Sequence, residues 1–278
     1  MNLIYKHGHL RHGTIYQYPD GQQNVKLDMN YFDNPKESVK ITCSVRNFSE
    51  LEILLCIVAA LQAEDFIIEQ IKFVYLFGLR SDRKFEPGTC NYVKDVLSPI
   101  IKRLESVSVY PIKILQPHGR SQLYITNSHS RFDLGYHHTL PDEFKHFQKI
   151  AGDTSAFDIV NCQNSVYRQF PLHFVKTRKE HEISLHIPDS QYHEIKNDER
   201  PILIMDDLCD GGATFIVEAE YLRDSKLLGD RKLYLFVYHG LFTNGLDTLL
   251  KHFDRIYTTN SYRDYPALDQ LKVIDVWS

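Results

Sequence analysis

Two adjacent acids followed by a glycine-rich turn give the clearest chemical signal in the chain. Residues 202–214 read ILIMDDLCDGGAT, so four apolar residues lead directly into Asp206 and Asp207. In an open α/β sheet, ligands bind outside the carboxyl ends of the strands, and these two carboxylates would fall there. They could accept hydrogen bonds from the 2- and 3-hydroxyls of a ribose, directly or through a metal.

The residues after the acids suit an anion. They are Asp210, Gly211, Gly212, Ala213 and Thr214. Glycines let the backbone turn tightly and point N–H groups at a phosphate, and the helix expected to follow has a dipole that favours negative charge at its start. A surface turn whose acids cap a helix would have the same sequence, and this alternative stays open.

Two short basic runs could also hold an anion. They are RSDRK at 80–84 and KTRK at 176–179. Runs this short are usually a solvated surface, and by themselves they do not identify a site.

The elements that must position these residues alternate between strands and helices. Strands are predicted at 39–45, 71–77, 110–116, 157–161, 172–176, 201–207 and 232–239. Helices are predicted at 49–64 (capped by Ser49), around 90–104, near 140–150 and at 213–224. This order is typical of parallel sheets covered on both faces, and two rounds of it fit two α/β domains joined within 125–144.

Composition narrows the class of protein. The chain has 278 residues, 43% hydrophobic and 24% charged, as in a soluble globular protein. A net charge of −4 gives no reason to expect nucleic acid. Five scattered cysteines without a CxxC pair argue against a disulfide framework and a structural zinc site. The start of the chain does not read as a signal peptide, and the apolar stretch 51–63 is too short for a bilayer. We therefore expect a cytoplasmic protein without membrane contact.

The order of strand, two acids, loop and threonine resembles the signature of type I phosphoribosyltransferases. Other motifs narrow the resemblance to the ribose-phosphate diphosphokinases, or phosphoribosyl-diphosphate (PRPP) synthetases. The resembling segments are YPDGQQNVKL (18–27), FGLRSDRKFEPGT (77–89), QPHGRSQ (116–122), VKTRKEH (175–181), VYHGLFTNG (237–245) and IYTTNSYRDYP (256–266). They follow the family's order and span nearly the whole chain.

The resemblance implies a fold of two tandem type I phosphoribosyltransferase-like domains. Each would be a mainly parallel sheet flanked by helices. An ATP-binding domain would comprise 1–135, and a ribose-phosphate-binding domain 136–265. Residues 266–278 would form a C-terminal strand that returns to the N-terminal domain.

The resemblance also implies an activity. The family transfers the β,γ-diphosphate of MgATP to the anomeric hydroxyl of ribose 5-phosphate and releases AMP. It assigns Lys176 and Arg178 to the transferring phosphoryl group, where an ammonium and a planar guanidinium suit oxygens that gain charge. The ribose phosphate would be bound by Asp206, Asp207 and the loop 210–214.

The same resemblance supplies an ATP site and a metal site. Tyr18 would stack on adenine and Asp20 would accept from its amine. The other ATP-binding residues would be Gln22, Arg80, Ser81, Arg83 and His118. His118 and Asp153 would contribute to a Mg²⁺ site. In the family a neighbouring subunit supplies the adenine segment, so a homodimer or hexamer is expected.

Departures from the family gather at places that face the substrates. Gly211 stands where the family has threonine, and Gln22 replaces a glutamate. The diphosphate loop lacks its glycines at 153–156, and the chain ends without the usual helix. Losing the threonine removes a contact to a terminal phosphate, and a smaller loop would let a diphosphate linkage pass.

Three functions, two catalytic and one non-catalytic, are compatible with these departures. We favour ADP-ribose as acceptor, which would give ADP-ribose pyrophosphate for NAD salvage, as in some phage-encoded relatives. An ordinary PRPP synthetase acting on ribose 5-phosphate and a non-catalytic regulatory relative are the alternatives. The chain retains Lys176, Arg178, His118 and the acid pair, which argues against the regulatory alternative. A transferase that uses PRPP with a base is weaker still, since it would need neither Arg80 nor Arg83.

Overall fold

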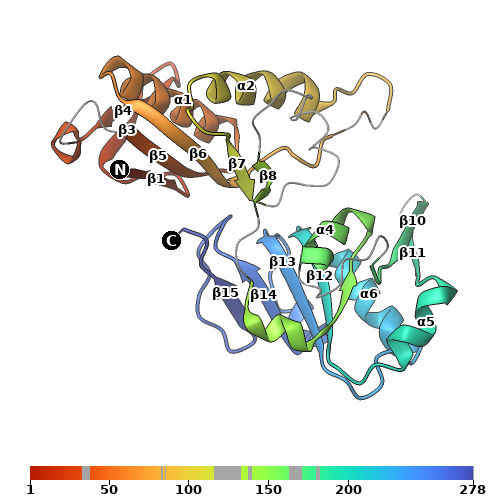
Figure 1. The fold of residues 1–278 in the computed structure, drawn as a ribbon. Coiled ribbons are helices and arrows are strands. Elements are labelled where there is room, and N and C mark those ends of the chain that lie inside the picture. Colours follow the sequence, from red (N-terminus) through yellow and green to blue (C-terminus); the bar gives the residue numbers. More distant parts are fainter. Residues whose placement is uncertain are drawn as a thin grey trace. The chain divides into compact units, whose positions relative to one another are not determined.

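The structure, a computed structural model, describes residues 1–32, 38–82, 84, 86–115, 133–136, 140–162, 171–179 and 182–277. The chain divides into two compact units, Met1–His138 and Thr139–Val276, and Trp277 groups with the first. Each unit contains one mainly parallel sheet flanked by helices (Figure 1). The predicted α/β fold class is confirmed.

The first unit is built on a six-stranded sheet. In order across the sheet its strands are β2 (His9–Leu10), β1 (Asn2–Lys6), β5 (Ser38–Val45), β6 (Ile67–Leu76), β7 (Lys113–Leu115) and β8 (Asp133–Tyr136). Only β2 runs antiparallel to its neighbour. A separate hairpin of β3 (Gly13–Gln17) and β4 (Gln23–Leu27) presents the segment resembling an adenine site. A 3₁₀ turn, η1 (Met29–Tyr31), follows the hairpin.

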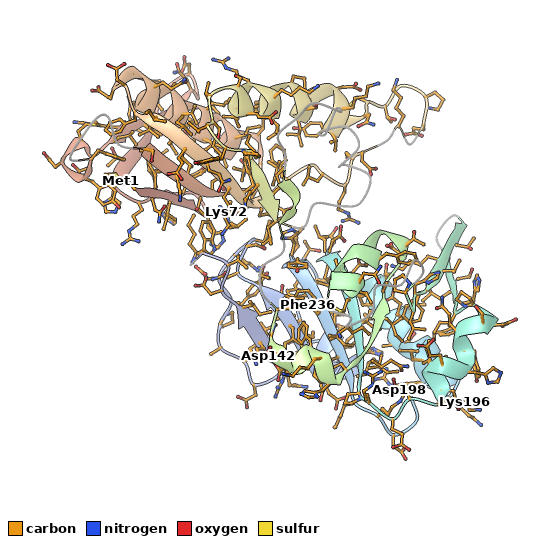
Figure 2. The ribbon with its side chains drawn as sticks, in the orientation of Figure 1. Met1, Lys72, Asp142, Lys196, Asp198 and Phe236 are labelled. Atoms are coloured by element: carbon orange, nitrogen blue, oxygen red, sulfur yellow. The ribbon has the colours of Figure 1, made fainter. Side chains whose placement is uncertain are left out.

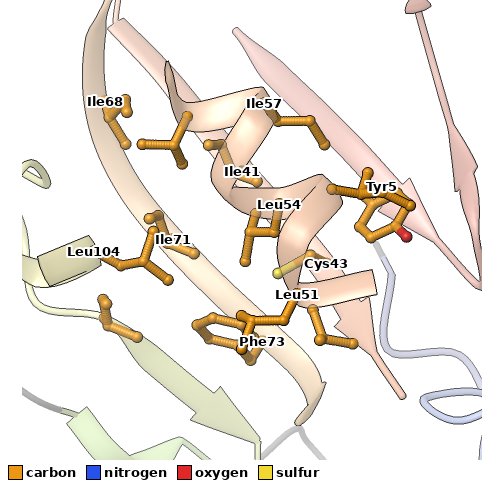
Figure 3. Close-up of a cluster of buried hydrophobic side chains, with 14 of the residues drawn as sticks. Tyr5, Ile41, Cys43, Leu51, Leu54, Ile57, Ile68, Ile71, Phe73 and Leu104 are labelled. Atoms are coloured by element: carbon orange, nitrogen blue, oxygen red, sulfur yellow. The ribbon is translucent and has the colours of Figure 1, made fainter. Parts of the chain in front are cut away.

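Helix packing on this sheet makes the first core. Helix α1 (Phe48–Ala63) buries Leu51, Leu54 and Ile57 among side chains of β5 and β6 (Figure 3). Helix α2 (Ser98–Ser106), which continues from the π-helical turn η2 (Val93–Leu97), adds Leu104 to the same cluster. Such apolar burial is the main stabilising contribution to a domain of this size.

The second unit is built on a five-stranded, fully parallel sheet. In order its strands are β15 (Leu271–Ile274), β14 (Arg255–Thr259), β13 (Leu233–Gly240), β12 (Ile202–Cys209) and β9 (Gln148–Ala151). Phe236 of β13 is fully buried and packs against Phe144 (Figure 2). Strand β12 is thus an inner strand, and its apolar run is buried as predicted.

Short helices and a hairpin surround the second sheet. They are η3 (Asp142–His146), η4 (Thr154–Ala156), α4 (Phe157–Cys162), β10 (Val175–Lys179), β11 (Glu182–His186), α5 (Asp189–Lys196), α6 (Ala213–Asp224) and α7 (Leu249–His252). Strands β10 and β11 pair only with each other. Helix α6 coincides with the helix predicted at 213–224.

Three local predictions are wrong. Asn47, not Ser49, caps α1, because its side chain accepts a hydrogen bond from the Glu50 amide at 2.9 Å. Residues 157–161 form helix α4 instead of a strand, since a short apolar run fits either element when it is buried. Residues 140–150 form a 3₁₀ helix and then strand β9, because all four residues of β9 are buried in the sheet.

Two further predictions need correction at the sheet level. The strand predicted at 172–176 is not a sheet strand: β10 begins at Val175 in the hairpin, and only His173 bridges to Ala151 of β9. Within the C-terminal segment predicted to return to the first domain, β15 instead pairs with β14 in the second sheet, and only Trp277 groups with the first unit. Within the described ranges no helix is long and apolar enough to cross a bilayer.

Candidate active site

The two acids lie in the carboxyl-terminal half of β12, which continues two residues beyond the predicted strand end, through Cys209. Asp206 and Asp207 are both buried, and the Asp207 amide donates to Asp206 Oδ1 at 2.9 Å. Gly152 follows the neighbouring strand β9 and lies against the Asp206 carboxylate. A Cβ on Gly152 would lie 2.6 Å from Asp206 Oδ2, so this close approach requires glycine.

The loop after the acids leads into α6. Gly212 caps the helix with a φ of +86°, and a Cβ there would be crowded by Leu249 at 3.0 Å. The backbone N–H groups of the first turn of α6 lack helical partners, and the helix dipole favours an anion beside them. Ala213 and Thr214 form this first turn. The predicted turn into a helix is therefore confirmed, with glycine required at its cap.

A second loop, which follows β13, braces the first. Thr243 Oγ1 donates to Asp210 Oδ1 at 2.8 Å, and the Asn244 amide donates to the Gly211 carbonyl at 3.3 Å. A Cβ on Gly211 would lie 2.7 Å from Asn244 Nδ2. Asn244 therefore lies where a side chain at position 211 would begin. The sequence motif at 237–245 pointed to this loop, but neither residue was singled out as part of the site.

Lys176 lies among carboxylates from three other elements. Its side chain, 13% exposed, extends from β10. Its Nζ lies 3.1 Å from Glu218 Oε1, 3.6 Å from Asp153 Oδ2 and 3.9 Å from Asp206 Oδ2. The structure thus brings together Lys176, Asp153 and Asp206, to which the sequence gave three separate roles. Arg178 lies on the same strand, but its side chain is outside the described part of the structure.

Glu218 is the member of this cluster that sequence reasoning missed. It lies on α6, one turn after Thr214, and its side chain is fully buried. Among the described residues neither of its oxygens has a hydrogen-bond partner of good geometry, so the Lys176 ammonium is its polar neighbour. A glutamate between apolar residues of α6 was the available signal, because a buried carboxylate requires a partner.

Burial and mutual repulsion set the charges in the cluster. Burial lowers the pKa of Lys176, but the carboxylates of Glu218, Asp206 and Asp153 raise it more, so the ammonium stays charged. Burial raises the pKa of Glu218 to about 8, despite the opposing effect of Lys176. Burial, and then the charge of Asp207, raise the pKa of Asp206 well above its usual range. The cluster therefore has three carboxyl groups to one ammonium, as expected of a site that binds cations or hydroxyl groups.

The residues proposed for adenine lie in an exposed turn of the first unit. Tyr18, Asp20 and Gln22 connect β3 to β4, and the Gly21 amide donates to the Tyr18 carbonyl at 2.9 Å. Asp20 Oδ1 accepts from the Gln22 amide at 3.2 Å. Tyr18 is 44% exposed and contacts Tyr16 edge to face. The geometry is that of a tight turn presenting an aromatic ring.

The other ATP-binding residues are described only in part. Arg80 is exposed after β6, and Ser81 accepts from the Val93 amide at 3.1 Å through its carbonyl. Arg83 and His118 lie outside the described residues. Within the described part of the chain, no group of three or more His, Cys, Asp or Glu is arranged to hold a metal ion.

Comparison with known proteins shows the fold. The chain superimposes on the crystal structure of phosphoribosylpyrophosphate synthetase from Mycobacterium smegmatis with a TM-score of 0.67 and 14% sequence identity. The match covers 99% of this chain and 94% of that chain. No family model matches the sequence, and no curated protein does. The chain thus shares the two-domain α/β architecture of that synthetase at a level of identity that shows fold alone.

Proposed function

We propose that this protein is a diphosphokinase that transfers the β,γ-diphosphate of ATP to the anomeric hydroxyl of a ribose-5-phosphate group and releases AMP. The observation that carries the proposal is the position of Lys176. Its ammonium lies 3.9 Å from Asp206, on the strand that leads into the glycine loop before α6. A fixed cation next to a ribose clamp and an anion-binding turn is what diphosphate transfer to a sugar phosphate requires.

Each side chain then has a defined role. Asp206 and Asp207 accept hydrogen bonds from the 2- and 3-hydroxyls of the ribose, while the loop 210–214 binds the 5-phosphate. The anomeric hydroxyl attacks the β-phosphorus and loses its proton to water, while the bond from the β-phosphorus to the α-phosphate oxygen breaks and AMP leaves. Lys176, together with Arg178, stabilises the charge that gathers on the transferring oxygens. No protein nucleophile is needed.

The residues proposed to bind ATP belong to the first unit. Tyr18 stacks on adenine, Asp20 and Gln22 bind the base, and Arg80, Ser81 and Arg83 bind the phosphates. A turn as exposed as that of Tyr18 is suited to complete a site on another copy of the chain. We therefore propose a homodimer or hexamer as the working form.

Magnesium would enter with ATP. Mg²⁺ is usually held by one or two carboxylates and the substrate phosphates instead of by a protein cage. The donor set fits this pattern, since Asp153 offers one half-exposed carboxylate. Asp153 would hold the ion with His118. When bound, the ion would neutralise the diphosphate charge.

We favour ADP-ribose as the acceptor over ribose 5-phosphate. The side-chain amide of Asn244 occupies the space that a side chain at position 211 would fill. The loop therefore offers backbone groups and this amide where the family has a threonine hydroxyl. Ala213, Thr243 and Asn244 are all exposed. This opening supports an acceptor that continues beyond its 5-phosphate. Ribose 5-phosphate remains the alternative acceptor.

One assay separates these possibilities. The protein is incubated with MgATP and either ADP-ribose or ribose 5-phosphate, and AMP release is followed. We expect AMP with ADP-ribose at the higher kcat/KM. AMP with ribose 5-phosphate alone would contradict the acceptor assignment. AMP with neither would contradict the diphosphokinase and favour a regulatory relative.

A further inference from the structure

The cluster around Lys176 contains one carboxylate to which the proposed reaction gives no task. Asp206 faces the ribose and Asp153 is half-exposed, whereas Glu218 is fully buried within α6. Phe215, Ala219 and Leu222 of the same helix are buried beside it in the core. Burying a carboxylate there is unfavourable unless a cation accompanies it. The side chain is therefore placed to contact Lys176, not the substrate.

The hairpin that carries Lys176 packs against α6, the helix of Glu218, through β11. Strands β10 and β11 pair with each other and lie outside the five-stranded sheet. Residues that flank the hairpin also contact α6: the Ile187 amide donates to Tyr221 Oη at 3.3 Å, and the Phe174 ring packs against Tyr221. Neither contact fixes the end of the long Lys176 side chain.

The distances single out Glu218 as the tether of the ammonium. The contact of 3.1 Å with Glu218 is the shortest of the three, and those with Asp153 and Asp206 are 3.6 and 3.9 Å. An ammonium has three donors on a flexible stem. When one donor is held by a buried carboxylate, the others remain available on the side of Asp206 and the substrate.

We propose that Glu218 is a positioning residue, which holds the Lys176 ammonium at the carboxyl end of β12 ready for the transferring diphosphate. This inference rests on the proposed function for its catalytic consequence, but the Lys176–Glu218 contact can be tested without any activity. Glu218 touches neither substrate and acts only through Lys176.

The experiment compares Glu218→Gln with Glu220→Gln, an exposed glutamate two residues along the same helix. Gln keeps the size of the side chain but cannot carry a negative charge at any pH. Unfolding curves establish that both variants fold. Glu218→Asp serves as the conservative variant. We expect Glu218→Gln to lower kcat by about 10- to 100-fold with the KM values for MgATP and acceptor little changed, because a misplaced group acts mainly on the transition state. Glu218→Asp should recover part of this loss, and Glu220→Gln should resemble the original protein.

The second readout is the rate at which an amine-acylating reagent modifies Lys176, measured by peptide mass spectrometry relative to the exposed Lys196. Glu218→Gln should raise this rate several-fold, and Glu220→Gln should leave it unchanged. If the protein releases no AMP but the acylation rate rises in Glu218→Gln, the proposed function is wrong and the role of Glu218 in holding Lys176 is supported. An unchanged acylation rate overturns the inference, whether or not kcat falls.

Discussion

The Gly152 backbone packs so tightly against Asp206 that a single added carbon would lie 2.6 Å from the carboxylate oxygen. This contact joins the end of β9 to the end of β12, and the Gly152 amide also donates to the Met205 carbonyl at 2.9 Å. Gly152 therefore constrains the orientation of Asp206 in the proposed ribose clamp.

We expect Gly152→Ala to displace the Asp206 carboxylate and raise the KM for the acceptor. The double variant Gly152→Ala/Asp206→Ala provides the control, because the added methyl group has nothing to displace once the carboxylate is gone. A double-mutant cycle on kcat/KM should show coupling of at least about 0.5 kcal/mol, as for residues in contact. Additive effects would mean that the close approach does not position Asp206.

Lys176→Ala should lower kcat by roughly 100- to 1000-fold, because the lost charge acts on oxygens that become more negative in the transition state. ATP affinity, measured by equilibrium binding, should change little. Lys196→Ala, at an exposed lysine of α5, is the matched control. If turnover survives the loss of Lys176, the catalytic assignment is wrong.

Gly211→Thr should shift preference toward ribose 5-phosphate, since a hydroxyl would again be available for a terminal phosphate. The φ of Gly211 is not positive, so the backbone accepts threonine, but Asn244 must move. We therefore expect a larger shift in Gly211→Thr/Asn244→Ala, with a change of roughly tenfold in the ratio of kcat/KM values for one charge-assisted hydrogen bond. Asn244→Ala alone is the control. An unaltered ratio in the double variant would mean that this loop does not determine which acceptor is used.

The raised pKa of Glu218 predicts a pH dependence of stability. Burial raises this pKa from 4.5 to about 8, so the folded state retains a proton that the unfolded state loses. The stabilising contribution is complete below 4.5 and is lost as pH rises through about 8. Stability should therefore fall across this window by up to about 1.4 kcal/mol per pH unit from this group.

Urea unfolding across the same pH window tests this prediction. The side chain introduced by Glu218→Gln cannot titrate. The unfolding free energy of this variant should therefore increase relative to that of the original protein as pH rises. Glu220→Gln should follow the original protein at each pH. Parallel curves for all three proteins would show that Glu218 does not titrate in this range.

The residues of the candidate site that come from one continuous segment could be predicted from the sequence. The run from Ile202 through Thr214 shows its strand, acids, glycine cap and helix in order, because each depends on local hydrophobicity or backbone conformation. The same local logic failed at residues 157–161, where β-branched residues favoured a strand and burial against β9 and β12 allowed a helix.

The contacts that complete the site could not be predicted in this way. Glu218 reads as an ordinary helix residue until the hairpin brings Lys176 beside it. Asn244 reads as a turn residue until its loop lies against Gly211. In both cases the partner comes from a distant segment, and sequence periodicity contains no information about which distant segments meet.

The parallel pairing of β9 with β12 also has a consequence for how the protein folds. Strand β9 is made of buried residues, and its partner is synthesised only after α4, the β10–β11 hairpin and α5. Closing so long a loop is slow, and an unpaired apolar strand is prone to associate with other chains until it is closed. Asp153 follows β9 and Asp206 lies on β12, so these two residues of the site come together only when the two strands pair. Growth at a lower expression rate should therefore increase the yield of active protein more than a tag that only improves solubility.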